Sequence, residues 1–113
     1  MVNIMKHPLK ISALVLALAG VVAAGADAKA NWEKYCKGCH GVEGKGDTKL
    51  GQKFECRDYS DAKVQATLTD EKMFKSIKDG LTKGGEVQMK PYSDKLTDQE
   101  IKDLVAFIRK LKK

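Results

Sequence analysis

The chain has few of the residues that large cores, sheets and membrane spans require. Only seven of its 113 residues are aromatic, two are proline, and two are histidine. No segment alternates apolar and polar side chains for long enough to indicate a sheet. No apolar run reaches the roughly 20 residues of a membrane-spanning helix. These absences exclude an extended β fold and a membrane-embedded protein, and the length allows one domain at most.

Apolar residues are concentrated at the N-terminus, where they fill 19 of the first 28 positions but only 29 of the remaining 85. Positive charge at Lys6 and Lys10 precedes a stretch of 16 uncharged residues, which is too short for an anchor. Ala26-Asp27-Ala28 has the small-residue pattern of a cleavage site, and Ala24-Gly25-Ala26 is a second one. The pattern predicts an export signal over residues 1–28 that is removed near Ala28, and a periplasmic domain over residues 29–113.

Helices and loops account for the rest of the chain. Residues 31–36 are typical of a short helix with Asn31 as its N-cap. Four glycines mark residues 41–51 as a turn-rich loop, and residues 82–91 also have the composition of a loop. Between these loops, a helix is predicted to begin at Thr69 and to end at Gly80, with Met73, Phe74 and Ile77 buried.

The last helix has the clearest boundaries. Thr97 and Glu100 form a capping box, in which each side chain satisfies the other residue's exposed backbone N–H group. Apolar residues then recur with helical spacing and predict one buried face: Ile101, Leu104, Val105, Ile108 and Leu111.

Candidate chemistry is concentrated in Cys36-Lys37-Gly38-Cys39-His40. C-x-x-C-H is the pattern of covalent haem attachment, because two thiols in a tight turn can add to two vinyl groups while the adjacent histidine reaches the iron. Two other interpretations use the same residues. A zinc site of Cys36, Cys39, His40 and Cys56 has an admissible composition but leaves the rest of the sequence unexplained. A thioredoxin-like dithiol requires a preceding strand, which the sequence does not indicate.

Elimination reduces the number of candidates for the second axial ligand of a haem iron. His7 lies in the segment that we expect to be removed, and Cys56 is a poor candidate because thiolate ligation belongs to oxygen-activating haem proteins. Two methionines remain. Met73 belongs to the apolar stripe of a helix, where methionine usually fills the core. Met89 lies in a loop just before Pro91, whose fixed φ would help to hold that loop, so Met89 is the favoured ligand.

Five segments, in this order along the chain, resemble the class I monohaem cytochromes c of the small bacterial type. They are residues 32–36, the motif at 36–40, the glycine-rich loop, residues 88–92 and residues 96–109. The resemblance covers essentially the whole predicted domain. It implies an all-α fold in which the N- and C-terminal helices cross and one haem lies between them.

The same resemblance implies the roles of individual residues. Cys36 and Cys39 would form the thioethers, His40 would be the proximal iron ligand and Met89 the distal one. Many family members have proline directly after the methionine, whereas Lys90 intervenes here before Pro91. On the C-terminal helix, Phe107 would pack against the N-terminal helix near Tyr35.

Ligation by histidine and methionine would fill both axial positions of the iron. The implied function is therefore a soluble one-electron carrier between exported or membrane-bound redox partners, and not an enzyme. The alternative is a haem enzyme or gas sensor with an open distal site, such as a peroxidase, and it requires that Met89 does not bind the iron.

Lysines are frequent near the predicted site. They occur around the motif and its loop and on both sides of Met89, and as a set they predict acidic partners and salt-dependent association: Lys37, Lys45, Lys49, Lys53, Lys83, Lys90 and Lys95. No recognised nucleic-acid-binding motif accompanies them, and we expect a monomer without stable membrane insertion.

Aromatic residues and the third cysteine complete the predicted site. Phe54, Tyr59 and Tyr92 are expected to pack in the haem pocket, with the Tyr59 hydroxyl near a propionate. Cys56 is either a buried thiol or an exposed one that could link two chains.

Overall fold

The computed structural model describes residues 24–113, and most of the predicted export signal lies outside the described residues. The elements in chain order are α1 (Ala24–Asn31), the π-helical turn η1 (Trp32–Cys36), α2 (Lys37–His40), α3 (Lys49–Lys53), α4 (Ala62–Thr67), α5 (Asp70–Asp79), β1 (Leu81–Lys83), β2 (Glu86–Met89) and α6 (Asp98–Arg109). The described part of the chain is mostly helical, which confirms the predicted all-α class. None of its helices is long and apolar enough to cross a membrane.

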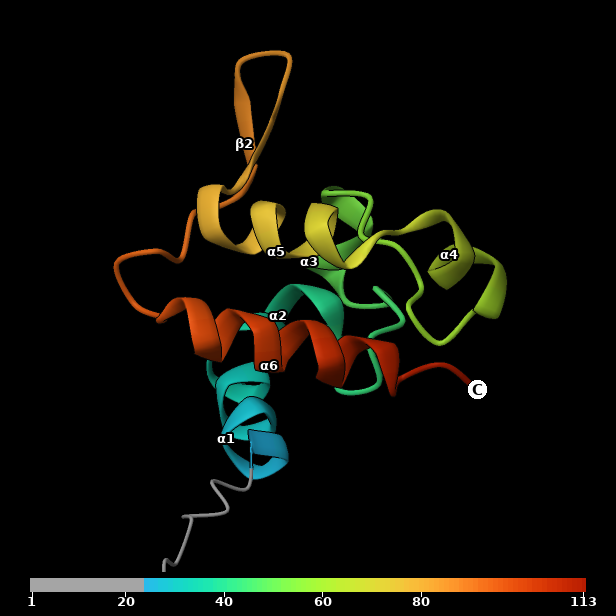
Figure 1. The fold of residues 1–113 in the computed structure, drawn as a ribbon. Helices are drawn as coiled ribbons and strands as arrows, with labels where there is room; N and C mark the ends of the chain where they lie inside the picture. Colours follow the sequence, from blue (N-terminus) through green and yellow to red (C-terminus); the bar gives the residue numbers. More distant parts are fainter. Residues whose placement is uncertain (1–23) are drawn as a thin grey trace, which may run out of the picture.

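Helix α6 lies between α1 and α5 and packs against both (Figure 1). Its capping box is present as predicted, with Thr97 Oγ1 accepting from Glu100 N and Glu100 Oε1 accepting from Thr97 N. The side chains of Ile101 and Leu104 are fully buried. The predicted apolar face is confirmed for Ile101, Leu104, Val105 and Ile108, whereas Leu111 lies beyond the end of α6 and is half-buried.

Residues 24–40 form one nearly continuous helical stretch that runs through α1, η1 and α2. The predicted N-cap at Asn31 is wrong, because Asn31 has a helical backbone and its side chain makes no capping hydrogen bond. Instead, Asn31 Nδ2 donates to Glu100 Oε2 at 3.2 Å. The helix begins earlier because α1 packs on α6, and Ala28 of α1 is only 1% exposed.

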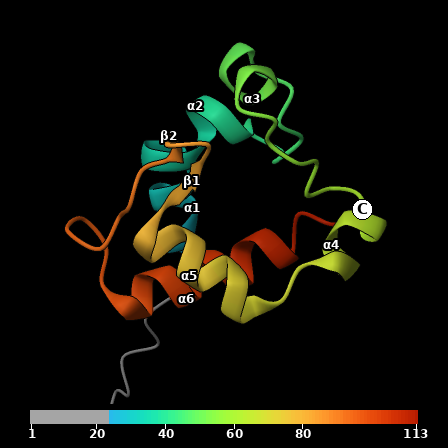
Figure 2. The same cartoon turned by 90° about the horizontal axis from the view of Figure 1, so that it is seen from above.

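Helix α5 begins and ends where the sequence predicted. Thr69 Oγ1 accepts from Lys72 N, and Gly80 ends the helix with a φ of +78°, which glycine adopts without strain. Met73 and Ile77 are buried, and Phe74 is half-buried. In both views α5 lies beside α6 (Figure 2).

The predicted packing of Phe107 against the N-terminal helical stretch is confirmed, although its aromatic neighbour differs from the expected one. The Phe107 ring centroid lies 5.5 Å from that of Trp32. The expected neighbour, Tyr35, pairs edge-on with Tyr92 at 5.7 Å. The two helical stretches therefore meet through Trp32.

The glycine-rich loop ends earlier than the sequence indicated, because Thr48 caps a short helix. Its Oγ1 accepts from Gly51 N, so residues 49–53 form α3. A further short helix, α4, starts after Asp61, whose carboxylate accepts from Lys63 N. Neither helix carries an apolar periodicity long enough to be recognised in the sequence.

The predicted loop at residues 82–91 is also partly wrong, because β1 and β2 pair as an antiparallel hairpin that projects from the body (Figure 1). Leu81 lies opposite Met89, and a register irregularity follows Leu81. The turn consists of Gly84 and Gly85, both with positive φ, as tight hairpin turns require. Strands of three and four residues are too short to show alternation, so the sequence pattern missed them.

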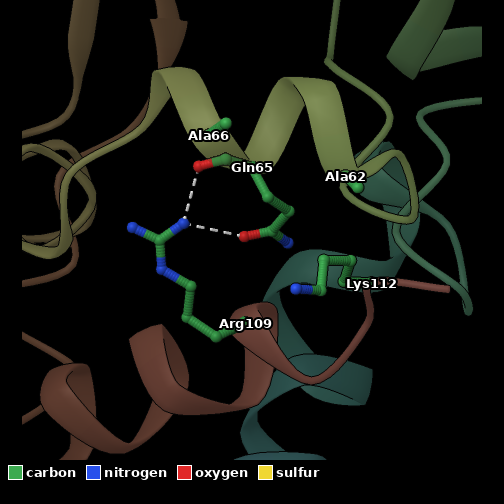
Figure 3. A pocket seen from close by; sticks show the side chains of 5 residues that line it. All are labelled: Ala62, Gln65, Ala66, Arg109 and Lys112. Carbon is green, nitrogen blue, oxygen red and sulfur yellow. Dashed lines mark hydrogen bonds between the residues drawn. The ribbon is translucent and has the colours of Figure 1, made fainter.

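Arg109 and Gln65 tie α4 to α6 beneath a surface hollow of about 300 Å³ (Figure 3). Arg109 Nη1 donates to the backbone and side-chain oxygens of Gln65. Gln65, which is 5% exposed, donates from Nε2 to the carbonyls of Tyr59 and Ile108. This network satisfies a buried polar side chain and fixes the segment that leads to Tyr59.

Candidate functional site

A cavity of about 800 Å³ brings the predicted site residues together. This volume lies within the usual range for cofactor and ligand pockets. Cys36, Cys39 and His40 line the cavity, and so does Met89. The other apolar and aromatic residues of its wall come from several further parts of the chain: Trp32, Tyr35, Leu50, Phe54, Tyr59, Leu68, Met73, Ile77, Leu81, Val87, Tyr92, Leu104 and Ile108.

The apolar surface of the cavity indicates an apolar occupant. Four large apolar side chains are exposed in the described part of the chain, and three of them line this cavity: Leu50, Leu81 and Val87. Exposed apolar surface that is gathered in one place usually marks a binding site. A large, flat macrocycle would cover these side chains, so the cavity fits the group that the motif predicts.

The two cysteines of the motif lie one helical turn apart, at the end of η1 and within α2. Neither forms a disulfide in the described part of the chain, and Cys36 is 7% exposed. Burial, followed by the proximity of Cys39, raises the pKa of the Cys36 thiol to about 12. The thiol is therefore neutral in this apolar cavity and is not suited to be a reactive thiolate of the redox dithiol type.

His40 has the protonation state that a metal ligand needs. Burial lowers the pKa of its imidazole, which favours the neutral ring. Its Nδ1 is the one buried side-chain polar atom without a hydrogen-bond partner in the region the structure describes. Packing therefore holds the imidazole in the cavity wall.

Backbone hydrogen bonds fix the turn that follows the motif. Thr48 Oγ1 donates to the carbonyl of Cys39 at 2.6 Å, and Gly46 N donates to that of His40 at 2.8 Å. The next carbonyl, that of Gly41, accepts from Trp32 Nε1 at 3.1 Å. Three successive carbonyls are therefore satisfied, which holds Cys39 and His40 in a defined position.

Both methionine candidates lie in the cavity wall. Met73 is buried at 6% exposure on α5, and Met89 is half-buried at the end of β2. The backbone of Met89 is held by strand pairing with Leu81, and its carbonyl approaches Gly80 so closely that a Cβ there would overlap it. Packing in the core explains Met73, whereas Met89 is positioned by the backbone of a projecting hairpin.

The predicted aromatic lining is confirmed, because Phe54, Tyr59 and Tyr92 all line the cavity. Tyr92 also donates from its hydroxyl to the carbonyl of Tyr35 at 3.1 Å. Cys56 is half-buried in the same wall, where burial raises the pKa of its thiol. It is neither the fully buried thiol nor the fully exposed one that the sequence suggested.

The charged residues of the cavity wall differ from the expected set. Of the seven lysines near the predicted site, only Lys90 lines the cavity. Lys45 and Lys83 are paired with acidic side chains, with Glu43 and Glu55 respectively. The other basic residues of the wall were not in the expected set: Lys34 lies two residues before the motif, and the fold brings Arg57 and Lys72 to the cavity.

A zinc site receives no support from this geometry. Within residues 24–113, no group of three or more histidine, cysteine, aspartate or glutamate side chains is placed to hold a metal ion. Cys36, Cys39, His40 and Cys56 share the cavity wall without forming such a cluster.

Comparison with known proteins agrees with this site. The family model described as cytochrome c oxidase, cbb3-type, subunit III matches residues 23–108. The chain belongs to this family of c-type cytochromes. No curated protein matches the chain. The structural neighbours include KustC0563 c-type cytochrome, which is 37% identical with a TM-score of 0.68 over 77% of this chain and 99% of its own.

Two larger cytochromes share the fold with this cytochrome. Cytochrome cL from Hyphomicrobium denitrificans is 26% identical, with a TM-score of 0.58 over 82% of this chain and 51% of its own. Cytochrome cL from Methylophaga aminisulfidivorans is 20% identical, with a TM-score of 0.59 over 85% of this chain and 58% of its own. This chain is thus a small monohaem class I cytochrome c that binds haem c covalently, and electron transfer is the activity of its family.

The tight turn after the motif generates a prediction about two glycines. A Cβ at Gly51 would overlap the carbonyl oxygens of Gly46 and Cys39, whereas a Cβ at Gly38 has no atom within 4 Å. We expect Gly51→Ala to destabilise the haem-loaded protein by about 2 kcal/mol, because overpacking must displace the backbone. Gly38→Ala, which adds the same methyl group inside the motif, should change stability by less than about 1 kcal/mol. Guanidinium unfolding of both variants measures the difference, and equal effects would contradict this account.

Proposed function

We propose that this cytochrome is a one-electron carrier in which Cys36 and Cys39 attach the haem and His40 and Met89 are its axial ligands. The observation that carries the proposal is that one apolar cavity gathers these four residues from two segments far apart in the sequence. When bound, the haem supplies an iron centre that gains and loses one electron.

The proposed ligands account for electron transfer without catalysis. A neutral His40 and the thioether of Met89 would both bind the iron, which would leave neither substrate nor dioxygen a site on it. Methionine as the second ligand raises the reduction potential relative to a second histidine, and an apolar wall tunes the potential further. Tyr92 and Phe54 belong to that wall and would keep water away from the bound haem.

The charges around the cavity support docking of acidic redox partners. Four basic side chains line the cavity wall, whereas Glu55 is its one acidic residue: Lys34, Arg57, Lys72 and Lys90. Positive charge around an exposed haem edge steers acidic partners and raises the association rate at low salt. We infer brief contacts through a small interface, which suit a carrier that must leave each partner quickly. A monomer is sufficient for this function.

Export to the periplasm completes the proposal, and the packing of α1 bears on where the signal is cut. Ala28 is 1% exposed and belongs to the core beneath α6. Cleavage after Ala28 would remove this side chain from the domain, whereas cleavage after Ala26 would retain it. We therefore infer the second of the two predicted sites, which leaves Asp27 as the first residue.

Mass spectrometry of the exported protein tests the position of the cut. We expect the intact haem-loaded mass to correspond to a chain that begins at Asp27, because that chain keeps Ala28 in the core. Ala28→Ser keeps a small residue at position 28, so both predicted cleavage patterns remain, and this variant serves as the control for processing. A mass that corresponds to a chain beginning at Lys29 would contradict the inferred position.

Substitution of the two methionines tests the axial ligand. We expect Met89→Leu to abolish the long-wavelength charge-transfer band of methionine-ligated ferric haem. It should also lower the midpoint potential by on the order of 100 mV, a fraction of the roughly 0.8 V range that axial ligands control. Met73→Leu makes the same chemical change in the same cavity and should keep the band. Loss of the band in Met73→Leu alone would assign the ligand to Met73.

Rapid carbon monoxide binding by the reduced wild-type protein would indicate an open distal site and overturn the proposed function.

Reversal of charge at the cavity tests the docking surface. We expect the double variant Lys72→Glu and Lys90→Glu to slow oxidation by hexacyanoferrate(III), a small anionic oxidant, by roughly tenfold at low salt. The matched control, Lys63→Glu with Lys102→Glu, changes the net charge equally at exposed positions away from the cavity. The rates should converge as salt is added, because screening removes steering. The midpoint potentials of both variants are measured as well, because a changed driving force for electron transfer would also change the oxidation rate. Equal slowing in both variants would contradict a localised docking surface.

A further inference from the structure

The imidazole of His40 contacts two aromatic rings in the cavity wall. Its centroid lies 5.4 Å from that of Tyr59, with the ring planes stacked at 28°. The Trp32 ring lies 5.7 Å away and is tilted by 36°. Both separations are within the range of favourable aromatic pairs. His40 therefore has defined aromatic neighbours in addition to its backbone anchors.

The position of a ligating imidazole is usually fixed by a hydrogen bond from its second ring nitrogen to a carbonyl, a carboxylate or water. His40 Nδ1 is buried and donates to no carbonyl or carboxylate of the described residues. The carbonyls of His40 and Gly41 accept from Gly46 N and Trp32 Nε1, respectively. The rings of Tyr59 and Trp32 therefore constrain the imidazole plane by packing against it.

Tyr59 is well anchored for this role. Its backbone N donates to the carbonyl of Gly44 at 2.8 Å, and its own carbonyl accepts from the buried Gln65 Nε2 at 2.8 Å. A Cβ at Gly44 would lie 3.5 Å from Tyr59 Cβ and 3.6 Å from Trp32 Cζ2, so both aromatic residues pack against the same glycine. The polar anchors of Tyr59 are backbone groups, which leaves its ring free to make the contact with His40.

We propose that Tyr59 is a positioning residue that sets the plane of the His40 imidazole through ring stacking, with Trp32 as the second contact. This inference rests on the proposed ligation of iron by His40. Tyr59 acts through the ligand and does not touch the iron. The orientation of the imidazole determines how its orbitals overlap with those of the iron, so Tyr59 affects the electronic structure of the redox centre.

The test is the pattern of paramagnetically shifted haem-methyl resonances in the NMR spectrum of the oxidised protein, which depends on the orientation of the axial ligand planes. Tyr59→Leu removes the ring, and Tyr59→Phe removes only the hydroxyl. The matched control is Phe107→Leu, because Phe107 contacts Trp32 and is one ring removed from His40. All variants are studied as haem-loaded, full-length proteins after export.

We expect Tyr59→Leu to change the order or the spread of the haem-methyl resonances. Tyr59→Phe and Phe107→Leu should retain the wild-type pattern, the first because the stacking ring is still present. The same change in Tyr59→Leu and Phe107→Leu would overturn the proposal, since it would reflect general loosening of the core. An unchanged pattern in Tyr59→Leu would also overturn it.

Measurements on the wild-type protein keep the test informative if Tyr59→Leu does not retain haem. Nuclear Overhauser contacts between the Tyr59 and His40 rings must be present, and their absence overturns the proposal without any variant. Paramagnetic shifts of the His40 ring protons report ligation itself. If these shifts are absent, the proposed function fails. If they are present while Tyr59→Leu leaves the methyl pattern unchanged, only the positioning role fails.

Discussion

The packing of α6 against α1 and α5 is the contact on which the rest of the structure depends. Ile101 and Leu104 are fully buried there, and Leu104 also forms part of the cavity wall. At the far end of α6, Arg109 holds α4 through Gln65. One helix therefore supplies the core, one side of the site and the anchor for the segment that carries Tyr59.

This arrangement explains how such a small chain makes a stable site. Its domain has few apolar residues, and several of the larger ones face the cavity instead of one another. A covalently attached macrocycle completes the core, because it covers apolar side chains that would otherwise be exposed to water. The cofactor is thus a structural element as well as the redox centre.

Features that depend on a few neighbouring residues could be predicted from the sequence. Thr97 and Gly80 bound their helices as expected, because caps and left-handed turns are local interactions. Asn31 was misassigned because a good capping residue does not cap when the helix continues on its N-terminal side, and that continuation depends on the packing of Ala28. The hairpin was missed because its strands are held by pairing and are too short to show a pattern.

The sequence by itself determined the attachment motif with its histidine and the two candidate methionines, because these depend on residue type and spacing alone. Only the tertiary structure decided which side chains share the cavity with them. It brought Lys72, Arg57 and Cys56 to the cavity wall and stacked Tyr59 on His40. The physical reason is that these contacts join elements distant in the chain, whose relative positions are set by helix packing and by no local preference.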